Sequence, residues 1–409
     1  MTLNLTQKPC VLEPKQPPMT PHQHLELQRA LKNPLGSRRI GEIASTGNKV
    51  SIVINDVTRP MPSGRIVKML LTELRSAGVQ SKDVTVIVGT GVHRACSDAE
   101  LSAMLGNAVK QNVSVKNHDC KDSEDLVNLG KTRRGVPVIL SKTVAEADIK
   151  ILTGMITPHH VAGYSGGRKS IMPGVAGLEA LRIHHSQKFR PIGPAMGVLK
   201  NNLFHEEAEE AAEITEVDFI VNVVLNSKKQ IIRGVAGDLK EAWQGVSASE
   251  NIYAVDAPSL ADVVITSPGG YPKDINLWQA QKAISSAEML VRKGGTIVLV
   301  AECEEGFGEH TFSRFFENTA SPAEVIEKFN RRGYEPGLSK AFMYARALEN
   351  AEIIIVSDKI TDAELTKVYT KRASSIDRAF EMAKNRLGQV DQIVVMPHAT
   401  EIVPRIKQE

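Results

Sequence analysis

The sequence predicts an α/β protein of two domains, in which mostly parallel sheets are flanked by helices. Its 409 residues exceed what one hydrophobic core usually serves, so two domains are expected. Short, continuous runs of Val and Ile recur along the chain, as in strands that are covered on both faces. Helical patterns separate several of these runs, which is the order of elements in βαβ units.

The predicted elements follow from these periodicities in chain order. Strands are expected at 50–55, 84–89, 136–140, 148–153, 218–225, 262–267, 296–301, 352–357 and 392–396. Helices are expected at 63–77, 97–105, 203–214, 277–291, 321–331 and 375–385. The proline-rich segment 9–21 is expected to form an extended arm. A proline-containing connection near 255–261 divides the chain into predicted domains 1–258 and 259–409.

The composition excludes several classes of protein. The net charge of +3 is small, and Lys and Arg are evenly spread, unlike in a nucleic-acid-binding stripe or a polybasic membrane anchor. Aromatic residues make up only 4% of the chain, too few for a platform on which bases stack. The four cysteines lie far apart, which is typical of a reducing compartment. Because no long apolar run occurs, we expect a cytoplasmic protein whose partners include neither nucleic acid nor membrane.

Residues suited to chemistry follow four predicted strands, at 55–59, 89–94, 153–160 and 267–272. Open parallel sheets bind ligands outside the carboxyl ends of their strands, so we expect these loops to share one crevice. Asp56 can bond a ligand hydroxyl, Arg59 can bind a carboxylate or phosphate, and His93 can act as an acid or base. The alternatives are a local turn with an Asp56–Arg59 ion pair, and a histidine that caps the next helix.

Two pairs of adjacent histidines lie near the centre of the chain. His159 and His160 are expected in an extended segment, where neighbouring side chains point in opposite directions. His184 and His185 follow a helical stretch, where neighbours diverge by about 100°. We therefore expect one histidine of each pair to face the site, and the spacing leaves open which one.

The glycine-rich segment 163–170 contains Arg168 and Lys169. It matches a phosphate-binding P-loop imperfectly, because Arg168 stands where the second glycine is required. Its backbone is still suited to cradling an anion, and a lysine in a crowded basic site can act as a nucleophile. Further along, Gln279 and Lys282 share one face of a predicted helix, where they either contact a ligand or are solvated.

Taken together, these segments resemble the nickel-dependent lactate racemase family. The matching segments are 56–60, 89–94, 157–169, 171–174, His185, and 270–272 with Asp274, Gln279 and Lys282. The resemblance implies a racemase or epimerase that inverts the Cα of a 2-hydroxy acid, either lactate or a larger acid. It places the active site in the cleft between a cofactor-binding domain (1–258) and a C-terminal domain that contributes substrate-binding residues (259–409).

The resemblance also implies a cofactor, the nickel pincer nucleotide (nickel pyridinium-3,5-bisthiocarboxylic acid mononucleotide). Lys169 would be its covalent tether, and His185 would be the protein ligand of Ni. Further cofactor contacts are implied for Asp56, Val57, Thr58, Arg59 and Pro173. Enzymes that synthesise the cofactor are implied as the partners needed for activation.

The same resemblance implies how the substrate is bound and inverted. His93 and His159 would be the two acid/bases for a reversible hydride transfer. Substrate-binding roles are implied for Arg59, Gln279 and Lys282. Lactate-active members carry an aromatic contact in the C-terminal domain, whereas this chain has no tryptophan after Trp278. Phe342 and Tyr344 are the candidates to replace it.

Two other functions stay open from the residues alone. One is a hydrolase that holds an ordinary metal ion with His159, His185 and a carboxylate. The other is a non-catalytic nucleotide-binding protein built on segment 163–170.

Overall fold

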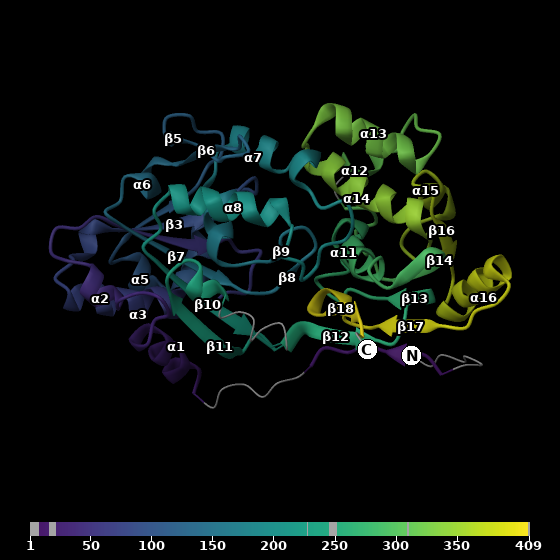
Figure 1. Cartoon of the computed structure of the whole chain (residues 1–409), viewed down its shortest axis with the longest axis horizontal. Coiled ribbons are helices and arrows are strands. Elements are labelled where there is room, and N and C mark those ends of the chain that lie inside the picture. The colour runs from purple at the N-terminus through teal and green to yellow at the C-terminus, as the bar shows by residue number, and fades with distance from the viewer. Residues whose placement is uncertain (1–7, 16–21, 227, 245–251, 309–310, 408–409) are drawn as a thin grey trace.

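The computed structural model describes residues 8–15, 22–226, 228–244, 252–308 and 311–407, which form two lobes (Figure 1). Each lobe is built on a six-stranded sheet with helices on both faces. The predicted fold class, α/β with mostly parallel sheets flanked by helices, is confirmed. In the described part of the chain, no helix is long and apolar enough to cross a membrane.

The N-terminal lobe has the strand order β11-β10-β7-β2-β3-β4. Within this six-stranded sheet, only β10 and β11 pair antiparallel. The strands are β2 (Val50–Asn55), β3 (Val84–Gly89), β4 (Ser114–Asn117), β7 (Ile149–Met155), β10 (Phe219–Leu225) and β11 (Ile231–Gly237). Along β2, Ile52 and Ile54 pack on one face of the sheet and Val53 packs on the other, which explains the continuous apolar run.

Helices cover both faces of this sheet. One face carries α1 (Gln23–Lys32), α2 (Ile40–Ile43), α3 (Ser63–Ser76), α4 (Asp98–Leu105) and α5 (Asn107–Lys110). The other carries α6 (Lys142–Ala145), α7 (Leu178–His184), α8 (Leu203–Ile214) and α9 (Glu241–Gln244). Helix α4 begins with a capping box, in which Ser97 and Glu100 satisfy each other's backbone N–H groups.

The C-terminal lobe has the fully parallel order β1-β17-β13-β14-β15-β16. The strands are β1 (Cys10–Val11), β13 (Ala261–Thr266), β14 (Val291–Val300), β15 (Glu352–Val356), β16 (Lys371–Ala373) and β17 (Ile393–Met396). One face carries α11 (Leu277–Ala287), α12 (Thr311–Arg314), α13 (Pro322–Arg332), α14 (Pro336–Asn350) and α15 (Asp362–Thr366). Helix α16 (Ile376–Leu387) covers the other face.

Two predicted elements differ from the structure. The run 136–140 forms β6 (Pro137–Ser141), which pairs antiparallel with β5 (Leu126–Lys131) in a hairpin outside the large sheet. The turn of this hairpin contains Gly135 with a φ of +93°, a conformation that favours glycine. The helix expected to reach residue 291 ends at Ala287, because β14 already begins at Val291.

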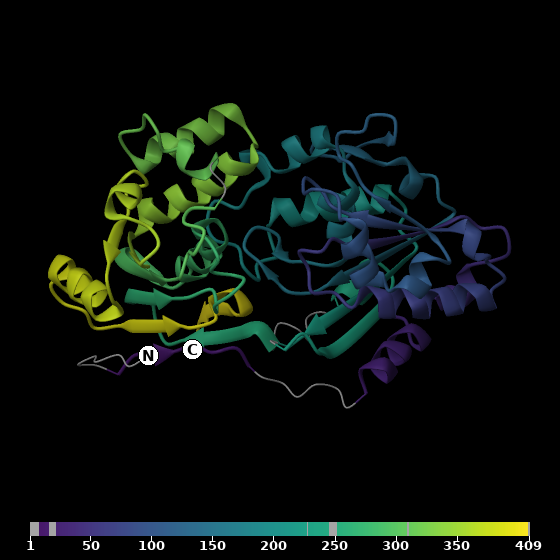
Figure 2. The same ribbon diagram turned by 180° about the vertical axis from the view of Figure 1, so that it is seen from behind.

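The proline-rich arm links the two lobes and also contributes a strand to a sheet. Its residues Cys10 and Val11 form β1 at the edge of the C-terminal sheet, whereas α1 lies on the N-terminal lobe (Figure 2). A second crossing leads from β11 to β12 (Ala254–Ala257), which pairs parallel with β18 (Val403–Ile406). Two segments of the chain therefore join the lobes. The division at 258/259 stays a prediction.

Candidate active site

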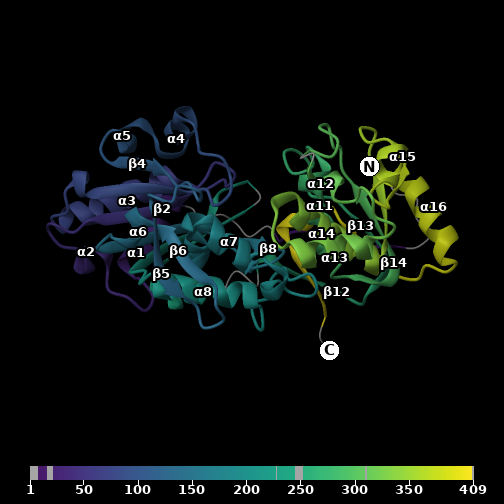
Figure 3. The ribbon, with the colours of Figure 1, turned by 90° about the horizontal axis from the view of Figure 1, so that it is seen from above.

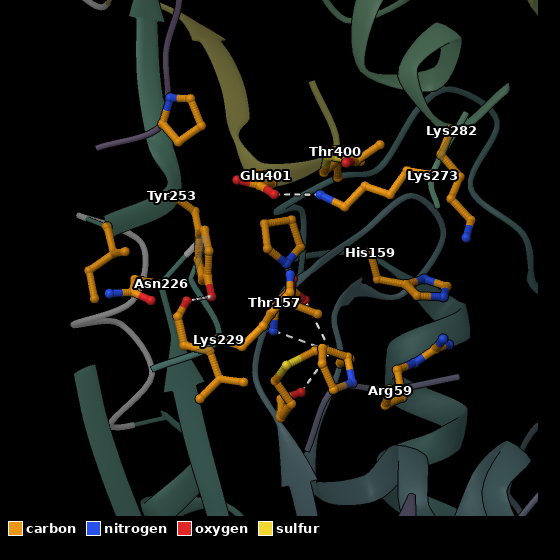
Figure 4. Close-up of a pocket in the computed structure, with 18 of the residues that line it drawn as sticks. Arg59, Thr157, His159, Asn226, Lys229, Tyr253, Lys273, Lys282, Thr400 and Glu401 are labelled. Atoms are coloured by element: carbon orange, nitrogen blue, oxygen red, sulfur yellow. Dashed lines mark hydrogen bonds and ion pairs between the residues drawn. The ribbon is translucent and has the colours of Figure 1, made fainter. Parts of the chain in front are cut away.

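A cavity of about 280 Å³ lies between the two lobes. The N-terminal lobe lines it with the loops that follow β2, β7 and β10, which contribute Arg59, His159 and Asn226 (Figure 4). Figure 3 shows β8 (Pro158–His159) where the two lobes meet. The C-terminal lobe lines it with Gln279 and Lys282 of α11. The expectation that strand-end loops share one crevice is therefore confirmed for the loops 55–59 and 153–160, whereas the loop 89–94 does not line the cavity.

The loop after β13 departs from that expectation. Its residues 267–272 do not line the cavity, and Tyr271 is 79% exposed. The chain reaches the cavity only at Lys273, which forms an ion pair with Glu401 on the cavity wall. Helix α11 then begins after Asn276, whose side chain accepts a hydrogen bond from the Gln279 N–H at 3.1 Å. This cap orients the first turn of α11 toward the cavity.

Asp56 and His93 are held together just outside the cavity lining. His93 Nδ1 lies 2.6 Å from Asp56 Oδ2, and Asp56 Oδ1 accepts hydrogen bonds from the Thr58 hydroxyl and N–H at 2.6 and 3.2 Å. Burial alone would raise the pKa of the Asp56 carboxyl, but the hydrogen bonds from His93 and Thr58 outweigh it, and the pKa lies below its usual value. The local turn is present, but the described contacts include no Asp56–Arg59 ion pair. His93 is paired with Asp56 and does not cap α4, whose N-cap residue is Ser97.

Two close approaches of backbone explain the glycines beside His93. A Cβ on Gly89 would lie 3.3 Å from the backbone of Gly174, and one on Gly91 would lie 3.4 Å from the Pro173 carbonyl oxygen. The Gly91 N–H donates to the Gly174 carbonyl at 2.9 Å. The loop of His93 is therefore packed directly on the segment that contains Pro173.

His159 and His160 both line the cavity, so the expectation that only one faces the site was wrong. Strand β8 (Pro158–His159) ends between them and the chain turns at His160, so that the two rings stack with centroids 4.6 Å apart. His159 Nδ1 accepts the N–H groups of Val161 and Ala162 at 3.2 and 3.0 Å. The neutral ring therefore carries its proton on Nε2.

Charge and burial act together on these imidazoles. Burial, followed by the charge of Lys169, lowers the pKa of His159 well below its ordinary value. Burial, followed by the charges of Lys340 and Lys282, does the same for His160. Figure 4 shows the ammonium of Lys282 and the guanidinium of Arg59 approaching His159 from two sides. The histidines are therefore neutral in a basic surrounding.

Neither histidine of the second pair lines the cavity, and the pair divides into a structural residue and an available one. His184 is fully buried, and its Nε2 donates to the Phe204 carbonyl at 2.9 Å. Its Nδ1 is then an acceptor for His185 Nδ1–H at 3.3 Å, which also donates to the Leu181 carbonyl at 3.1 Å. This assignment of protons leaves the lone pair of His185 Nε2 without a partner among the described contacts. His185 is therefore the member of the pair that can bind a metal ion.

Arg168 is neither a solvated surface residue nor an anion clamp. It is 1% exposed, and it donates to the carbonyls of Ala162 and Tyr164 at 3.0 Å and to His205 Nδ1 at 3.0 Å. Its guanidinium lies 3.9 Å from the centroid of the Trp243 ring. Arg168 therefore binds the backbone of its own loop, and its guanidinium is not available to a phosphate.

The glycines of this loop also serve packing. A Cβ on Gly154 or Gly166 would lie 2.6 or 2.7 Å from Asn222 Oδ1, and one on Gly167 would lie 2.8 Å from the Trp243 ring. The Gly167 N–H donates to Asn222 Oδ1 at 3.2 Å. The resulting loop differs from a phosphate cradle, since its donors are turned toward the protein.

Lys169 is left as the chemically available residue of the segment. Burial lowers the pKa of its ammonium well below the ordinary value, and the charges of Arg59 and Arg168 lower it further. Its Nζ has no hydrogen-bond or ion-pair partner within the described ranges. Its charge also contributes to the lowered pKa values of His159 and His185, which places Lys169 in the same cluster as both. A buried amine whose pKa is lowered loses its proton more readily, which suits it to act as a nucleophile.

Gln279 and Lys282 are brought into the cavity as a pair. Lys282 Nζ donates to Gln279 Oε1 at 2.8 Å. Burial, and then the charges of Arg59 and Lys273, lower the pKa of Lys282 to about 8. The alternative of a solvated helix face is therefore wrong, because a buried ammonium faces an amide and other cations.

Three residues near the site were missed by sequence reasoning. Arg190 donates to the His185 carbonyl at 3.0 Å, the Tyr334 ring centroid lies 4.8 Å from that of His185, and Lys340 lies beside Lys282 and His160. None belongs to a recognisable motif, and α13 and α14 bring two of them across the lobe junction. The only available signal was a lysine in an otherwise apolar helical stretch of α14.

The two aromatic candidates of the C-terminal lobe are placed elsewhere. Tyr344 is fully buried and bonds to Thr370 at 2.9 Å, whereas Phe342 stacks on Phe329 at 4.6 Å in an apolar cluster between the lobes. Tyr334 is the C-terminal aromatic residue that reaches His185.

The site as a whole is a basic, partly buried cavity that suits an anionic ligand. The lining carboxylate, Glu401, is already paired with Lys273, and Asp56, just outside the lining, is paired with His93. Among the residues that the structure describes, no three His, Cys, Asp or Glu side chains gather as a metal-binding group. The set that the ordinary metal hydrolase requires, His159, His185 and a carboxylate, is thus not assembled there.

The fold and this cavity define a two-domain α/β enzyme with a basic cavity at the lobe junction. The model of the lactate racemase N-terminal domain matches residues 1–197, and that of the lactate racemase C-terminal domain matches residues 256–403. The chain belongs to the lactate racemase family and is an isomerase of the racemase type.

Curated relatives and solved structures agree with this assignment. A lactate racemase of Thermoanaerobacterium thermosaccharolyticum is 33% identical over 387 residues, 93% of this chain and 90% of the relative. A lactate racemase of Lactiplantibacillus plantarum is 33% identical over 382 residues, 92% of this chain and 90% of the relative. The structure of the T. thermosaccharolyticum lactate racemase apoprotein superposes with a TM-score of 0.89 at 32% identity, covering 97% of this chain and 94% of that one. A Thermotoga maritima protein, with a TM-score of 0.64 and 17% identity over 94% and 97% of the two chains, shares the fold.

Proposed function

We propose that this protein racemises or epimerises a 2-hydroxy acid at Cα, using a nickel pincer nucleotide tethered through Lys169. The observation that carries the proposal is the pairing of two available groups in one basic cluster. Lys169 presents a buried amine without a partner in the described chain, and His185 presents the lone pair of Nε2. These two groups can supply an amine nitrogen that a carboxyl-type group of the cofactor would acylate, and a nitrogen ligand for the metal.

The residues present fit such a cofactor. Arg59 lines the cavity and keeps part of its guanidinium available, since only one of its nitrogens donates, to the Thr58 hydroxyl at 3.1 Å and the Thr58 carbonyl at 3.4 Å. Together with Thr58 and Val57 it can bind an anionic nucleotide beside Pro173. When bound, the cofactor supplies the electron-poor centre that accepts hydride from Cα and returns it.

The substrate carboxylate is assigned to Lys282 and Arg59, which approach the cavity from opposite lobes (Figure 4). An ammonium and a guanidinium hold a carboxylate by charge-assisted hydrogen bonds. Gln279 then positions Lys282 through its amide oxygen and offers an N–H₂ donor to the substrate.

The two acid/bases are assigned to His93 and His159, which are prepared differently. Because Asp56 accepts Nδ1–H of His93, the His93 Nε2 lone pair is ready to take the hydroxyl proton. His159 instead carries its proton on Nε2 and donates it toward the cavity. For His159 to accept a proton at Nε2, its Nδ1 must release the N–H groups of Val161 and Ala162.

The proposal is tested with protein produced together with the cofactor-synthesis enzymes. We expect a mass adduct on the peptide that contains Lys169, stoichiometric nickel, and loss of optical purity when single enantiomers of 2-hydroxy acids are added. Lys169→Met should abolish the adduct, and His185→Gln should reduce nickel content while leaving the adduct in place. Lys188→Met, an exposed lysine on the same lobe, is the matched control. Racemisation by protein that carries neither adduct nor nickel would contradict the cofactor assignment.

A further inference from the structure

We infer that the substrate carries a second anionic group and that Lys340 binds it, which makes the substrate class a 2-hydroxydicarboxylic acid. This inference rests on the proposed racemase function and names the substrate of that same site. Lys340 belongs to none of the residue sets that bind the cofactor, the reacting carbon or the first carboxylate.

The backbone fixes Lys340 at the lobe junction. Its carbonyl oxygen accepts Nε2–H of Gln281 at 2.6 Å, so residue 340 of α14 lies beside α11 next to Lys282. The preceding residue, Ser339, accepts a hydrogen bond from Arg190 of the N-terminal lobe. The Lys340 ammonium lies 5.6 Å from the centroid of the Trp278 ring, which belongs to the first turn of α11. The side chain of Lys340 thus lies between α11 and the N-terminal lobe.

Lys340 lies just outside the cavity lining and shares its electrostatic environment. Its charge is the largest electrostatic influence on His160, which lines the cavity, and Lys282 and Arg190 are the charges that act on Lys340 itself. Within the described chain its ammonium has no hydrogen-bond or ion-pair partner. The contrast with the cations around it is clear, since Lys273 is paired with Glu401 and Arg346 with Glu288.

Two buried lysine side chains therefore remain without a carboxylate, those of Lys282 and Lys340. Burial, and then the charges of neighbouring cations, lower the pKa of both, so each holds its proton best beside an anion. A buried charge is costly unless it is paired. The single carboxylate of a simple 2-hydroxy acid can neutralise one of them, and its alkyl group would face the other. A second carboxylate on the substrate satisfies both, and the flat face of Trp278 supports the ammonium that receives it.

The test measures preference between acids that differ only in the distal group. The holoenzyme is given single enantiomers of lactate, malate and 2-hydroxyglutarate, and the loss of optical purity is followed by chiral chromatography. We expect kcat/KM for one of the diacids to exceed that for lactate by at least tenfold. Lys340→Met should lower this ratio at least tenfold, whereas Lys359→Met, an exposed lysine of the same lobe, should leave it unchanged.

A binding measurement separates recognition from turnover. Succinate and propionate lack the hydroxyl group and cannot react, so their Kd values for the holoenzyme report the distal carboxylate alone. We expect succinate to bind at least tenfold more tightly, with most of the difference lost in Lys340→Met. The comparison of succinate with propionate in the wild-type holoenzyme does not depend on this variant. It therefore tests recognition of a distal carboxylate even where Lys340→Met fails to fold.

The outcomes distinguish the two proposals. A preference for lactate, equal binding of succinate and propionate, or a ratio that Lys340→Met leaves intact overturns the assignment of Lys340 while racemisation stands. Failure to racemise any of the three acids, with succinate still bound more tightly, overturns the proposed reaction and leaves diacid recognition in place.

Discussion

His93 Nδ1 lies 2.6 Å from Asp56 Oδ2, across 37 residues of sequence, because β2 and β3 are neighbouring parallel strands that end at the same edge of the sheet. The pair links a half-exposed imidazole to a carboxylate whose side chain is only 7% exposed. An imidazole that is held at Nδ1 has one orientation and one tautomer, which is what a directional proton transfer requires.

Replacing Asp56 should therefore impair turnover more than binding. In Asp56→Asn, the amide can meet His93 with either its oxygen or its nitrogen, so the tautomer is no longer fixed. We expect kcat to fall by about 10²-fold or more while KM changes little. Steady-state racemisation kinetics measure this, with the exposed residue Asp358→Asn as the control. A fall in nickel or cofactor content instead would assign Asp56 to cofactor binding alone.

The affinity for substrate should depend on pH through Lys282. Its pKa is lowered to about 8, so the ammonium is charged below that pH and loses its proton as the pH rises through it. We expect KM for an anionic substrate to rise above about pH 8, approaching tenfold per pH unit where binding relies on this charge. In Lys282→Arg the charge persists, and the rise should move beyond pH 10. A KM that is equally steep in both proteins would exclude Lys282 as the titrating group.

Arg168 should be needed for stability rather than for ligand binding. Arg168→Lys loses the fork that reaches Ala162, Tyr164 and His205 together and leaves buried acceptors unsatisfied. We expect the free energy of unfolding to decrease by about 3 kcal/mol or more. Denaturant unfolding followed by Trp243 fluorescence measures this, and Arg182→Lys on the exposed face of α7 is the control. Full stability with weaker anion binding would restore the clamp interpretation.

Gly154 should not tolerate a side chain. An added Cβ would lie 2.6 Å from Asn222 Oδ1 and 3.1 Å from the Cα of Gly166, so Gly154→Ala must push β7 away from the segment that holds Lys169. Overpacking of this kind costs about 1–3 kcal/mol. Gly193→Ala has nothing within 4 Å and should leave the melting temperature unchanged. Equal melting temperatures for both variants would show that the loop can move without cost.

The sequence predicts the layout of the fold well, because the apolar runs of β2, β3 and β10 and the helix α8 are continuous and strongly patterned. It also places two of the three predicted N-terminal loops, 55–59 and 153–160, in one crevice, a consequence of parallel pairing. Predictions from local sequence patterns fail where a turn or a residue distant in the sequence determines the position of a side chain. The turn at His160 stacks two imidazoles that an extended segment would separate, and Trp243, which shields Arg168, lies 75 residues later in the chain.

The C-terminal lobe shows a second limit of sequence reasoning. Lys340 and Tyr334 lie within a helical hairpin whose periodicity describes only its packing against the C-terminal sheet. Their position at the cavity depends on how the lobes meet, and no local pattern encodes that meeting. The substrate-facing residues of such a junction become visible only with the assembled chain.

The edge strand β1 affects the order in which the two sheets of the molecule can be completed. Cys10 pairs with Val394, so a strand that precedes the N-terminal lobe in the sequence is matched to a strand that follows most of the C-terminal lobe. The N-terminal lobe contains all strands of its own sheet and can fold first, while the sheet of the other lobe has to await nearly the whole chain. The cavity, to which both lobes contribute, therefore forms only after both sheets are complete, whereas Lys169 and His185 can already be brought together in the N-terminal lobe.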